Sequence, residues 1–420
     1  MSSTVFTSGR HAPSVRDFIE DSARRLPEKI ALICDGQRMT YSALDAMANR
    51  LAQALAQLGV QRGDRVAVFM PNSVETVVVI FAIAKAGGVF VVINPTTKRE
   101  KLIYILNNCR ATALIAEARV DLEGIAPGST STVPSLLGCI RCGRGPARAT
   151  TATDFDFESA LSRFPDSPMP RNNIDLDLAC LIYTSGTTGK PKGTIHTHAG
   201  ALAQTAKEIW LGFDHKPQDR FFWLSDIGWM MGAWTILGNH HFGGTIFIYD
   251  GAPDYPSPSR LWEMIERPKI TTFGISPTAI RLLMKSDPPA GLAMASLRLL
   301  GSTGEPWDPV SYRWYFEHVG KARCPVINIS GGTEILGCFL LPLPAEPLKE
   351  CTLGGPAPGM AVEVVDESGT PVRGKKGYLV CTKPAPSMTR GVWRDPQRYL
   401  EAYWSRFPGW WWQGDWASVD

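Results

Sequence analysis

Short apolar runs alternate with amphipathic segments through the first 117 residues, and this alternation restricts the fold more than any other feature of the sequence. Residues 65–70 have the composition of a buried strand. Residues 74–86 have the length of a helix and end at the pair Gly87-Gly88, and residues 89–93 predict the next strand. Strands that are separated by helices are typical of a parallel, doubly wound sheet. The beginning of the chain is therefore predicted to form an α/β unit of this kind.

A second strand–helix series is predicted after residues 125–175, a segment rich in Ser, Pro, Gly and Arg that we interpret as a linker or an elaborated surface loop. Its strands are predicted at residues 178–184, 220–224, 245–249, 272–275, 297–301 and 326–329. From Gly354 onward, short alternating runs predict a small antiparallel β unit. We therefore expect an α/β fold with two doubly wound, mostly parallel sheets and flanking helices. The subdomains are expected over residues 1–175, 176–350 and 351–420.

Length and composition limit the class of protein. The chain has 420 residues, which is more than one hydrophobic core usually supports. The charged fraction of 20% is ordinary for a soluble globular protein. The net charge of +3 and the lack of a basic run with interleaved aromatics argue against nucleic acid and membrane surfaces as partners. The most apolar stretch, residues 77–94, contains Lys85, so it predicts a buried helix and strand and not a membrane span.

The terminus and the cysteines indicate a cellular compartment. Residues 1–13 lack the apolar core of a signal peptide. The nine cysteines are an odd number scattered through a long chain, which favours a reducing cytoplasm over a disulfide framework. Cys139 and Cys142 form one C-x-x-C pair without a second pair, so we favour a chance spacing over a metal site. We expect a cytoplasmic protein.

The sharpest local signal is the string YTSGTTGKPKG at residues 183–193. It follows an apolar strand, and its glycines and hydroxyl residues supply N–H and O–H donors that can surround phosphate oxygens. Lys190 and Lys192 add positive charge. The string is not a Walker A motif, because Gly186 and Gly189 are too close together and Pro191 follows the first lysine. It predicts a phosphate-binding loop, whereas a flexible solvated loop would be the plainer interpretation of a shorter Gly-Ser string.

Five segments in the same order resemble those of the adenylate-forming superfamily, which includes acyl-CoA synthetases, luciferases and peptide-synthetase adenylation domains. They are residues 183–193 (YTSGTTGKPKG), 225–232 (SDIGWMMG), 304–306 (GEP), 330–334 (SGGTE) and 414–415 (GD). The branch that they resemble most is that of the acetyl- and acetoacetyl-CoA synthetases. The resemblance spans nearly the whole chain. It implies the large N-terminal domain of this fold, with a small β-barrel-like subdomain at its end.

The resemblance also implies which residues bind ATP or AMP. They are Thr184, Ser185, Gly186, Thr187, Thr188, Gly189, Lys192, Gly304, Glu305, Pro306, Asn328, Ser330, Gly332, Thr333, Glu334 and Asp415. Thr184, Lys192 and Glu334 are implied as catalytic, with Glu334 as the ligand of Mg²⁺. Asp415 would accept both ribose hydroxyls, which suits the two oxygens of a carboxylate. Asn328 stands where many members have aspartate, and its side-chain oxygen would accept from the adenine amino group.

The acyl pocket implied by the resemblance contains Trp229, Met230, Met231, Thr303 and Gly331. The acetyl-CoA synthetase branch has a tryptophan at the position of Gly331. Glycine removes that wall, and methionines adapt to irregular apolar shapes, so we expect an acid larger than acetate. Glycine is also explained if the backbone there needs a conformation or a space that a side chain forbids. Both interpretations of Gly331 stay open at this point.

The implied reaction joins a carboxylic acid to AMP, expels pyrophosphate and passes the acyl group to coenzyme A. A carrier-protein thiol, another nucleophile and another oxyanion remain alternatives, as does a nucleotide-binding module without catalysis. Members of the superfamily continue through a hinge into a mobile C-terminal domain with a catalytic lysine, whereas this chain ends at Asp420. We therefore expect that this domain is absent from a truncated chain. The identity of the acid and the choice between monomer and homodimer stay open.

Several further residues carry two interpretations. His196 or His198 would approach the nucleotide or serve the fold, and His240-His241 are expected to be structural, since no third ligand has useful spacing. Residues 410–412 are three tryptophans, which predict packing of the β unit more than a stacking platform. Gln413 departs from the Thr or Ser that the superfamily has before the ribose aspartate, so the hydrogen bonding around Asp415 is left open.

Overall fold

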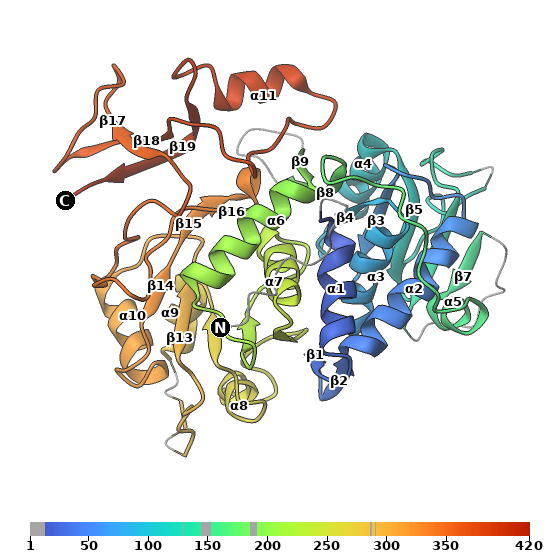
Figure 1. Ribbon diagram of the computed structural model, residues 1–420, viewed down its shortest axis with the longest axis horizontal. Coiled ribbons are helices and arrows are strands. Elements are labelled where there is room, and N and C mark those ends of the chain that lie inside the picture. Colours follow the sequence, from blue (N-terminus) through green and yellow to red (C-terminus); the bar gives the residue numbers. More distant parts are fainter. Residues whose placement is uncertain (1–12, 129, 144–152, 185–190, 286–287, 290) are drawn as a thin grey trace.

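The computed structural model describes residues 13–128, 130–143, 153–184, 191–285, 288–289 and 291–420. Two large sheets stand side by side, and a small antiparallel sheet lies over one end of the second (Figure 1). This architecture confirms the predicted α/β fold with two mostly parallel sheets and an antiparallel unit. No helix in the described part of the chain is long and apolar enough to cross a membrane.

The first sheet has seven strands in the order β7-β6-β5-β3-β4-β8-β9. Its strands are β3 (Arg65–Phe69), β4 (Val89–Val92), β5 (Ala111–Glu117), β6 (Gly138–Cys142), β7 (Asp154–Asp156), β8 (Leu178–Thr184) and β9 (Lys192–Thr197). All neighbours pair in parallel except β8 and β9, which form an antiparallel hairpin. The accompanying helices are α2 (Tyr41–Gln57), α3 (Val74–Lys85), α4 (Arg99–Cys109) and α5 (Phe157–Arg163).

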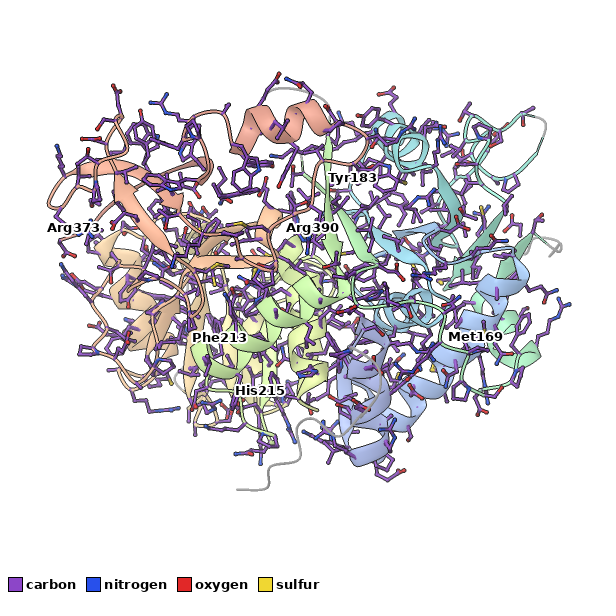
Figure 2. The ribbon with its side chains drawn as sticks, turned by 45° about the horizontal axis from the view of Figure 1, so that its top comes forward. Met169, Tyr183, Phe213, His215, Arg373 and Arg390 are labelled. Atoms are coloured by element: carbon purple, nitrogen blue, oxygen red, sulfur yellow. The ribbon has the colours of Figure 1, made fainter. Side chains whose placement is uncertain are left out.

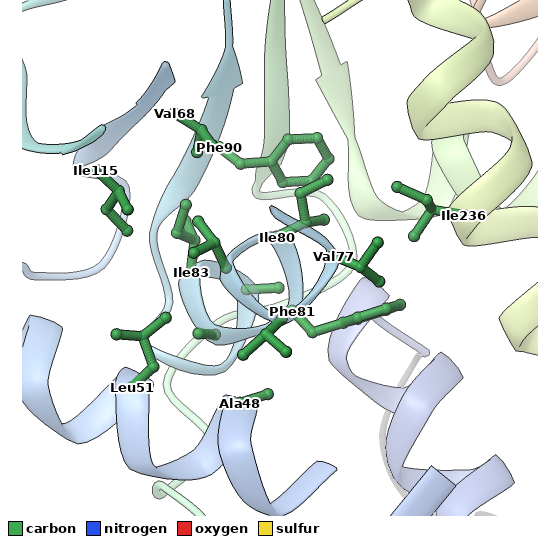
Figure 3. Close-up of a cluster of buried hydrophobic side chains, with 14 of the residues drawn as sticks. Ala48, Leu51, Val68, Val77, Ile80, Phe81, Ile83, Phe90, Ile115 and Ile236 are labelled. Carbon is green, nitrogen blue, oxygen red and sulfur yellow. The ribbon is translucent and has the colours of Figure 1, made fainter. Parts of the chain in front are cut away.

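Helix α3 is buried on every side, as its almost uninterrupted apolar sequence predicts. Val77, Ile80 and Phe81 pack among side chains from α2, the first sheet and α7 (Figure 3). Ser73 caps the helix by accepting a hydrogen bond from the Thr76 N–H. The position of α3 between the sheets therefore follows from its composition.

The interpretation of residues 125–175 as a linker is wrong in part. Strand β6 lies inside the sheet with all its residues buried, and β7 and α5 follow it within the same segment. The sequence of β6, GCIRC, has one large aliphatic residue, so the hydrophobic signal of a central strand is missing. Cys139 and Cys142 lie on this strand as buried free thiols.

The second sheet has the order β14-β13-β12-β10-β11-β1-β2. Its strands are β1 (Ile30–Cys34), β2 (Gln37–Thr40), β10 (Arg220–Trp223), β11 (Thr245–Ile248), β12 (Thr272–Gly274), β13 (Leu299–Ser302) and β14 (Val326–Asn328). Only β1 and β2 pair antiparallel. Strands β8 and β9 belong to the first sheet and β1 and β2 to the second, so the sheets do not divide at residue 175. The three-subdomain division remains an expectation.

Helices of the second half lie around this sheet, with α1 (Val15–Arg25) and α7 between the two sheets (Figure 1). They are α6 (His198–Lys207), the π-helix η1 (Glu208–Gly212), α7 (Met230–His241), α8 (Arg260–Glu266), α9 (Pro277–Leu283), α10 (Pro309–Trp314) and the π-helix η2 (Tyr315–Val319). The buried Glu208 of η1 accepts from Trp234 Nε1 of α7 at 2.6 Å. This bond ties α7 to the turn that follows α6.

The end of the chain is antiparallel. A short hairpin pairs β15 (Ser330–Gly332) with β16 (Gly337–Leu340) across the 3-10 turn η3 (Thr333–Ile335). A separate sheet has the order β17-β18-β19, with β17 (Val362–Val365), β18 (Lys376–Cys381) and β19 (Trp411–Ser418). Helix α11 (Pro396–Tyr403) lies beside β19 at the top of Figure 1. This arrangement brings the last 25 residues next to the β8–β9 hairpin and to η3.

Candidate nucleotide site

The β8–β9 hairpin holds the two ends of the predicted phosphate loop. Thr184 and Lys192 pair across its last register position, and Tyr183 pairs with Gly193. Ser185, Gly186, Thr187, Thr188 and Gly189 lie outside the described residues. The Thr184 hydroxyl is buried and has no hydrogen-bond partner among the residues that the structure describes. An unpartnered buried hydroxyl next to the loop is consistent with a donor for phosphate oxygen.

A segment from the end of the chain covers this hairpin. Trp393 N donates to Gly193 O at 2.8 Å, and Thr194 forms a β-bridge with Val392. Figure 2 shows Tyr183 on the hairpin near the segment that carries Arg390. The hairpin is therefore fixed both by its own sheet and by the segment that contains Val392 and Trp393.

Lys192, Glu334 and Tyr403 form a closed triangle of hydrogen bonds, which we call the clasp. Lys192 Nζ lies 2.8 Å from Glu334 Oε1 and donates to the Tyr403 hydroxyl at 2.6 Å. The Tyr403 hydroxyl donates to the same Oε1 atom at 2.8 Å. Burial raises the pKa of the Glu334 carboxyl, but the Lys192 charge and the two hydrogen bonds outweigh burial, so its pKa lies below the ordinary value. Glu334 is therefore ionised at neutral pH.

Asp415 reaches the same region through Gln413. Gln413 Nε2 donates to Asp415 Oδ2 at 2.9 Å and to Gly331 O at 3.4 Å. Burial raises the pKa of the Asp415 carboxyl, the bond from Gln413 opposes the rise, and the charge of Glu334 adds to it. The sequence left the hydrogen bonding around Asp415 open. In the structure, Gln413 links Asp415 to the β15–β16 hairpin.

Asn328 ends β14 with its amide oxygen unused. Its Nδ2 donates to Thr352 O at 3.1 Å, and its side chain is buried. The Oδ1 atom has no hydrogen-bond partner among the described residues. A buried acceptor without a donor is costly, so this atom fits a ligand N–H such as the amino group of adenine.

The predicted adenine segment forms a turn after β13. Gly304 has φ of +108°, which glycine adopts without strain. Glu305 points to α9, where it accepts from Thr278 N at 2.8 Å and from Arg281 at 2.6 Å. Glu305 and Pro306 can therefore shape the turn, and the charge of Glu305 is already paired with Arg281.

The predicted acyl set is divided between the surface and the core. Trp229 is 52% exposed, Met230 is partly buried, and Met231 is buried in a core that includes residues of the second sheet. The Thr303 hydroxyl donates to Ile329 O at 2.8 Å. Trp229 also borders a cavity of about 390 Å³ next to the hairpin. Its walls include Val92, Asn94, Thr97, Lys101 and Tyr183.

Gly331 lies against the backbone of β16. A Cβ atom at this position would lie 1.9 Å from Gly337 O and 2.3 Å from Cys338 Cα, and φ of Gly331 is not in the left-handed region. Glu208 supports β16 from behind by accepting from Cys338 N at 2.8 Å. The close approach of two backbones accounts for this glycine without reference to an acyl chain.

His196, His198, His215 and His240 are buried, and His241 is partly buried. Burial lowers the pKa of each of them from 6.5 to about 4. Only His196 lies near the site, where its Nε2 contacts Thr194 Oγ1 at 3.2 Å. The described residues contain no group of three or more His, Cys, Asp or Glu that could hold a metal ion by themselves.

The residues fit a magnesium–nucleotide complex more than a metal held by protein alone. Mg²⁺ takes oxygen ligands and is usually bound by one or two carboxylates together with substrate phosphates and water. Glu334 supplies one carboxylate, and Lys192 and Thr184 face the ends of the loop beside it. Asn328 ends β14 just before residues 330–334, and Asp415 is linked to Gly331 through Gln413.

The sequence singled out Lys192, Glu334, Asn328 and Asp415; Lys192 and Glu334 are in contact, Asp415 is linked to Gly331 through Gln413, and Asn328 lies two positions before Ser330. Tyr403 was not singled out. The sequence around Tyr403 carries no functional signal, because a tyrosine at the end of an amphipathic helix is an ordinary packing residue. The stacking of its ring on Trp411, with centroids 4.3 Å apart and planes 7° apart, explains one of the three consecutive tryptophans.

Comparisons with known proteins show the family to which the chain belongs. The family model described as "AMP-binding enzyme" matches residues 19–393. An acetyl-coenzyme A synthetase from Chlorobaculum tepidum is 34% identical over 411 residues, with 93% of this chain and 62% of the relative covered. One from Nitrosomonas europaea is 37% identical over 390 residues, with 87% and 58% covered. The solved acetoacetyl-CoA synthetase from Streptomyces lividans superposes with a TM-score of 0.87 at 29% identity and covers 96% of this chain and 65% of its own. The chain thus spans about 62% of the length of the acetyl-coenzyme A synthetase from Chlorobaculum tepidum.

Proposed function

Because the chain belongs to the AMP-binding enzyme family, we propose that the whole protein activates a carboxylic acid with ATP and then transfers the acyl group to coenzyme A. One observation carries the proposal. Lys192, Glu334 and Asp415 come from three distant parts of the chain and converge on residues 330–334. Two half-buried carboxylates and one lysine at a glycine-rich turn suit the ribose, the metal and the phosphates of one nucleotide.

This arrangement supports the first half-reaction of the proposed activity. A carboxylate oxygen of the acid attacks the α-phosphorus of ATP, the bond from that phosphorus to the bridging oxygen breaks, and pyrophosphate leaves with the electron pair. Such transfers depend on alignment and on stabilisation of charge. Thr184 and Lys192 would hold phosphate oxygens, Thr333 would donate to the α-phosphate, and Asp415 would accept from the ribose hydroxyls. Mg²⁺ bound at Glu334 would neutralise charge on the phosphates.

In the second half-reaction the sulfur of coenzyme A attacks the acyl carbon, AMP leaves, and the thiol proton is released. The cavity beside Trp229 is lined by Tyr183 of the β8–β9 hairpin, so it offers space for the acyl group or the thiol arm. The nine cysteines are all free, which supports the proposed cytoplasmic location.

Two measurements test the proposal. Calorimetry with the 420-residue chain is expected to detect binding of AMP and of ATP. If neither nucleotide binds, the nucleotide site is refuted. Isotope exchange between pyrophosphate and ATP, measured on the full-length protein with a panel of acids, is expected to depend on one class of acid. Thiol dependence is then compared between coenzyme A and a carrier protein. Transfer to the carrier protein alone would replace coenzyme A as the acceptor.

A further inference from the structure

The clasp contains one residue to which the proposed reaction assigns no role. Tyr403 lies at the last position of α11, in the part of the chain that follows the second sheet. Its hydroxyl oxygen accepts from Lys192 and its single proton goes to Glu334 Oε1. Burial and the Glu334 charge raise the pKa of Tyr403 far above its ordinary value, so the phenol keeps its proton and remains a donor.

Tyr403 is held rigidly by its own surroundings. Its ring stacks on Trp411 of β19. Lys192 Nζ lies 4.9 Å from the centre of the Tyr403 ring, within the range of a cation–π contact. Trp411 Nε1 in turn donates to Gln413 Oε1 at 3.4 Å, and Gln413 bonds to Asp415. The side chains on the candidate metal, phosphate and ribose positions are therefore connected through one aromatic pair.

The two bonds to Glu334 fall on the same atom. Both Lys192 and Tyr403 contact Oε1, and Oε2 takes part in neither contact. A carboxylate whose one oxygen is fixed by two donors cannot rotate freely about its last torsion. Its second oxygen is then oriented in advance for a cation, while the Lys192 ammonium stays beside the same carboxylate. Orientation before binding reduces the entropy that binding must overcome.

We propose that Tyr403 is a positioning residue that orients Glu334 and Lys192 for the magnesium–triphosphate part of the nucleotide. The inference rests on the proposed function, because it assigns Glu334 and Lys192 to that part. It differs from a purely structural role in one respect. A nucleotide without β- and γ-phosphates and without Mg²⁺ should not require the orientation that Tyr403 provides.

The test compares Tyr403→Phe with Tyr399→Phe in the 420-residue chain. Phenylalanine at position 403 keeps the stacked ring and removes only the hydroxyl. Tyr399 is one helical turn earlier on the same face, and its ring also contacts Tyr403 and Trp411, so the control makes the same chemical change beside the clasp. Calorimetry measures the affinity for MgATP and, without metal, for AMP, and a thermal melt measures stability.

We expect Tyr403→Phe to weaken MgATP binding about tenfold, the effect of one lost hydrogen bond to a charged group, and to change AMP binding less than about twofold. Tyr399→Phe should change neither affinity. An unchanged ratio of the two affinities in Tyr403→Phe would overturn the inference, and so would a joint loss of both affinities together with the melting temperature. If the unmodified chain binds neither nucleotide, the proposed function fails and the inference falls with it. If the unmodified chain binds both nucleotides and Tyr403→Phe does not weaken MgATP binding selectively, only the role of Tyr403 is refuted.

Discussion

Replacing Gly331 by alanine should destabilise the protein strongly, although the change adds one methyl group. The new Cβ would lie 1.9 Å from Gly337 O, whereas ordinary contact begins at 3.4 Å, so β15 and β16 would have to separate by about 1.5 Å. Strand β16 cannot shift away from β15 without loss, because Cys338 N donates to the buried Glu208 and Gly337 packs against the same carboxylate. The clash therefore has no inexpensive relaxation.

The magnitude follows from two contributions. Overpacking of a filled site costs about 1–3 kcal/mol. Breaking the Cys338–Glu208 bond leaves the buried Glu208 carboxyl short of a donor, at a further cost of about 1–3 kcal/mol. Alanine recovers under about 1 kcal/mol by reducing the entropy of the unfolded chain. We expect a net loss of about 2–5 kcal/mol in the free energy of unfolding, with weaker AMP binding because the same turn carries Thr333 and Glu334.

Gly355→Ala is the matched control, because a Cβ there would meet no atom within 4 Å and its φ lies outside the left-handed region. Urea unfolding and AMP calorimetry on both variants provide the comparison. Equal stability and equal AMP affinity in Gly331→Ala and Gly355→Ala would refute the steric argument. Gly331→Trp in the full-length protein then separates the two interpretations of this glycine. A folded, AMP-binding variant that loses large acids and keeps acetate would show that the glycine serves the acyl pocket.

Three further predictions concern charge. Asp415→Ala should weaken AMP binding more than about 100-fold, because two charge-assisted hydrogen bonds are lost; equal affinity by calorimetry would exclude the ribose role. Glu334→Gln should abolish the gain in ATP affinity that Mg²⁺ produces, and a metal titration that matches the unmodified protein would contradict the assignment. Burial lowers the pKa of His196, His198, His215 and His240 from 6.5 to about 4, so their contribution to stability is complete above pH 6.5 and is lost as the pH falls toward 4. Each should cost about 2 kcal/mol between pH 7 and pH 5, and a melting temperature that stays constant over this range would refute their burial as neutral rings.

Local patterns were sufficient for the elements that carry a strong hydrophobic period. Helix α3 and strands β3 and β4 lie where the alternation predicted them, and the chemistry of the residues around 183–193 and 330–334 could be recognised without coordinates. These features depend on neighbours within a few positions, because helix and strand preferences and the composition of a turn are local properties. Strand β6 was missed because its small residues carry no such period.

Partners that are distant in the sequence were decided by the tertiary structure. Strand β1 pairs with β11, which lies more than 200 residues later in the chain. The apolar run of β1 does not predict which strand it pairs with. Tyr403 reaches Lys192 across 211 positions, and Gln413 reaches Gly331 across 82. A tyrosine or a glutamine has the same local preferences whether it faces solvent or a carboxylate. Its role is set by the packing of α11 and β19 against the hairpins, which only the folded chain brings together.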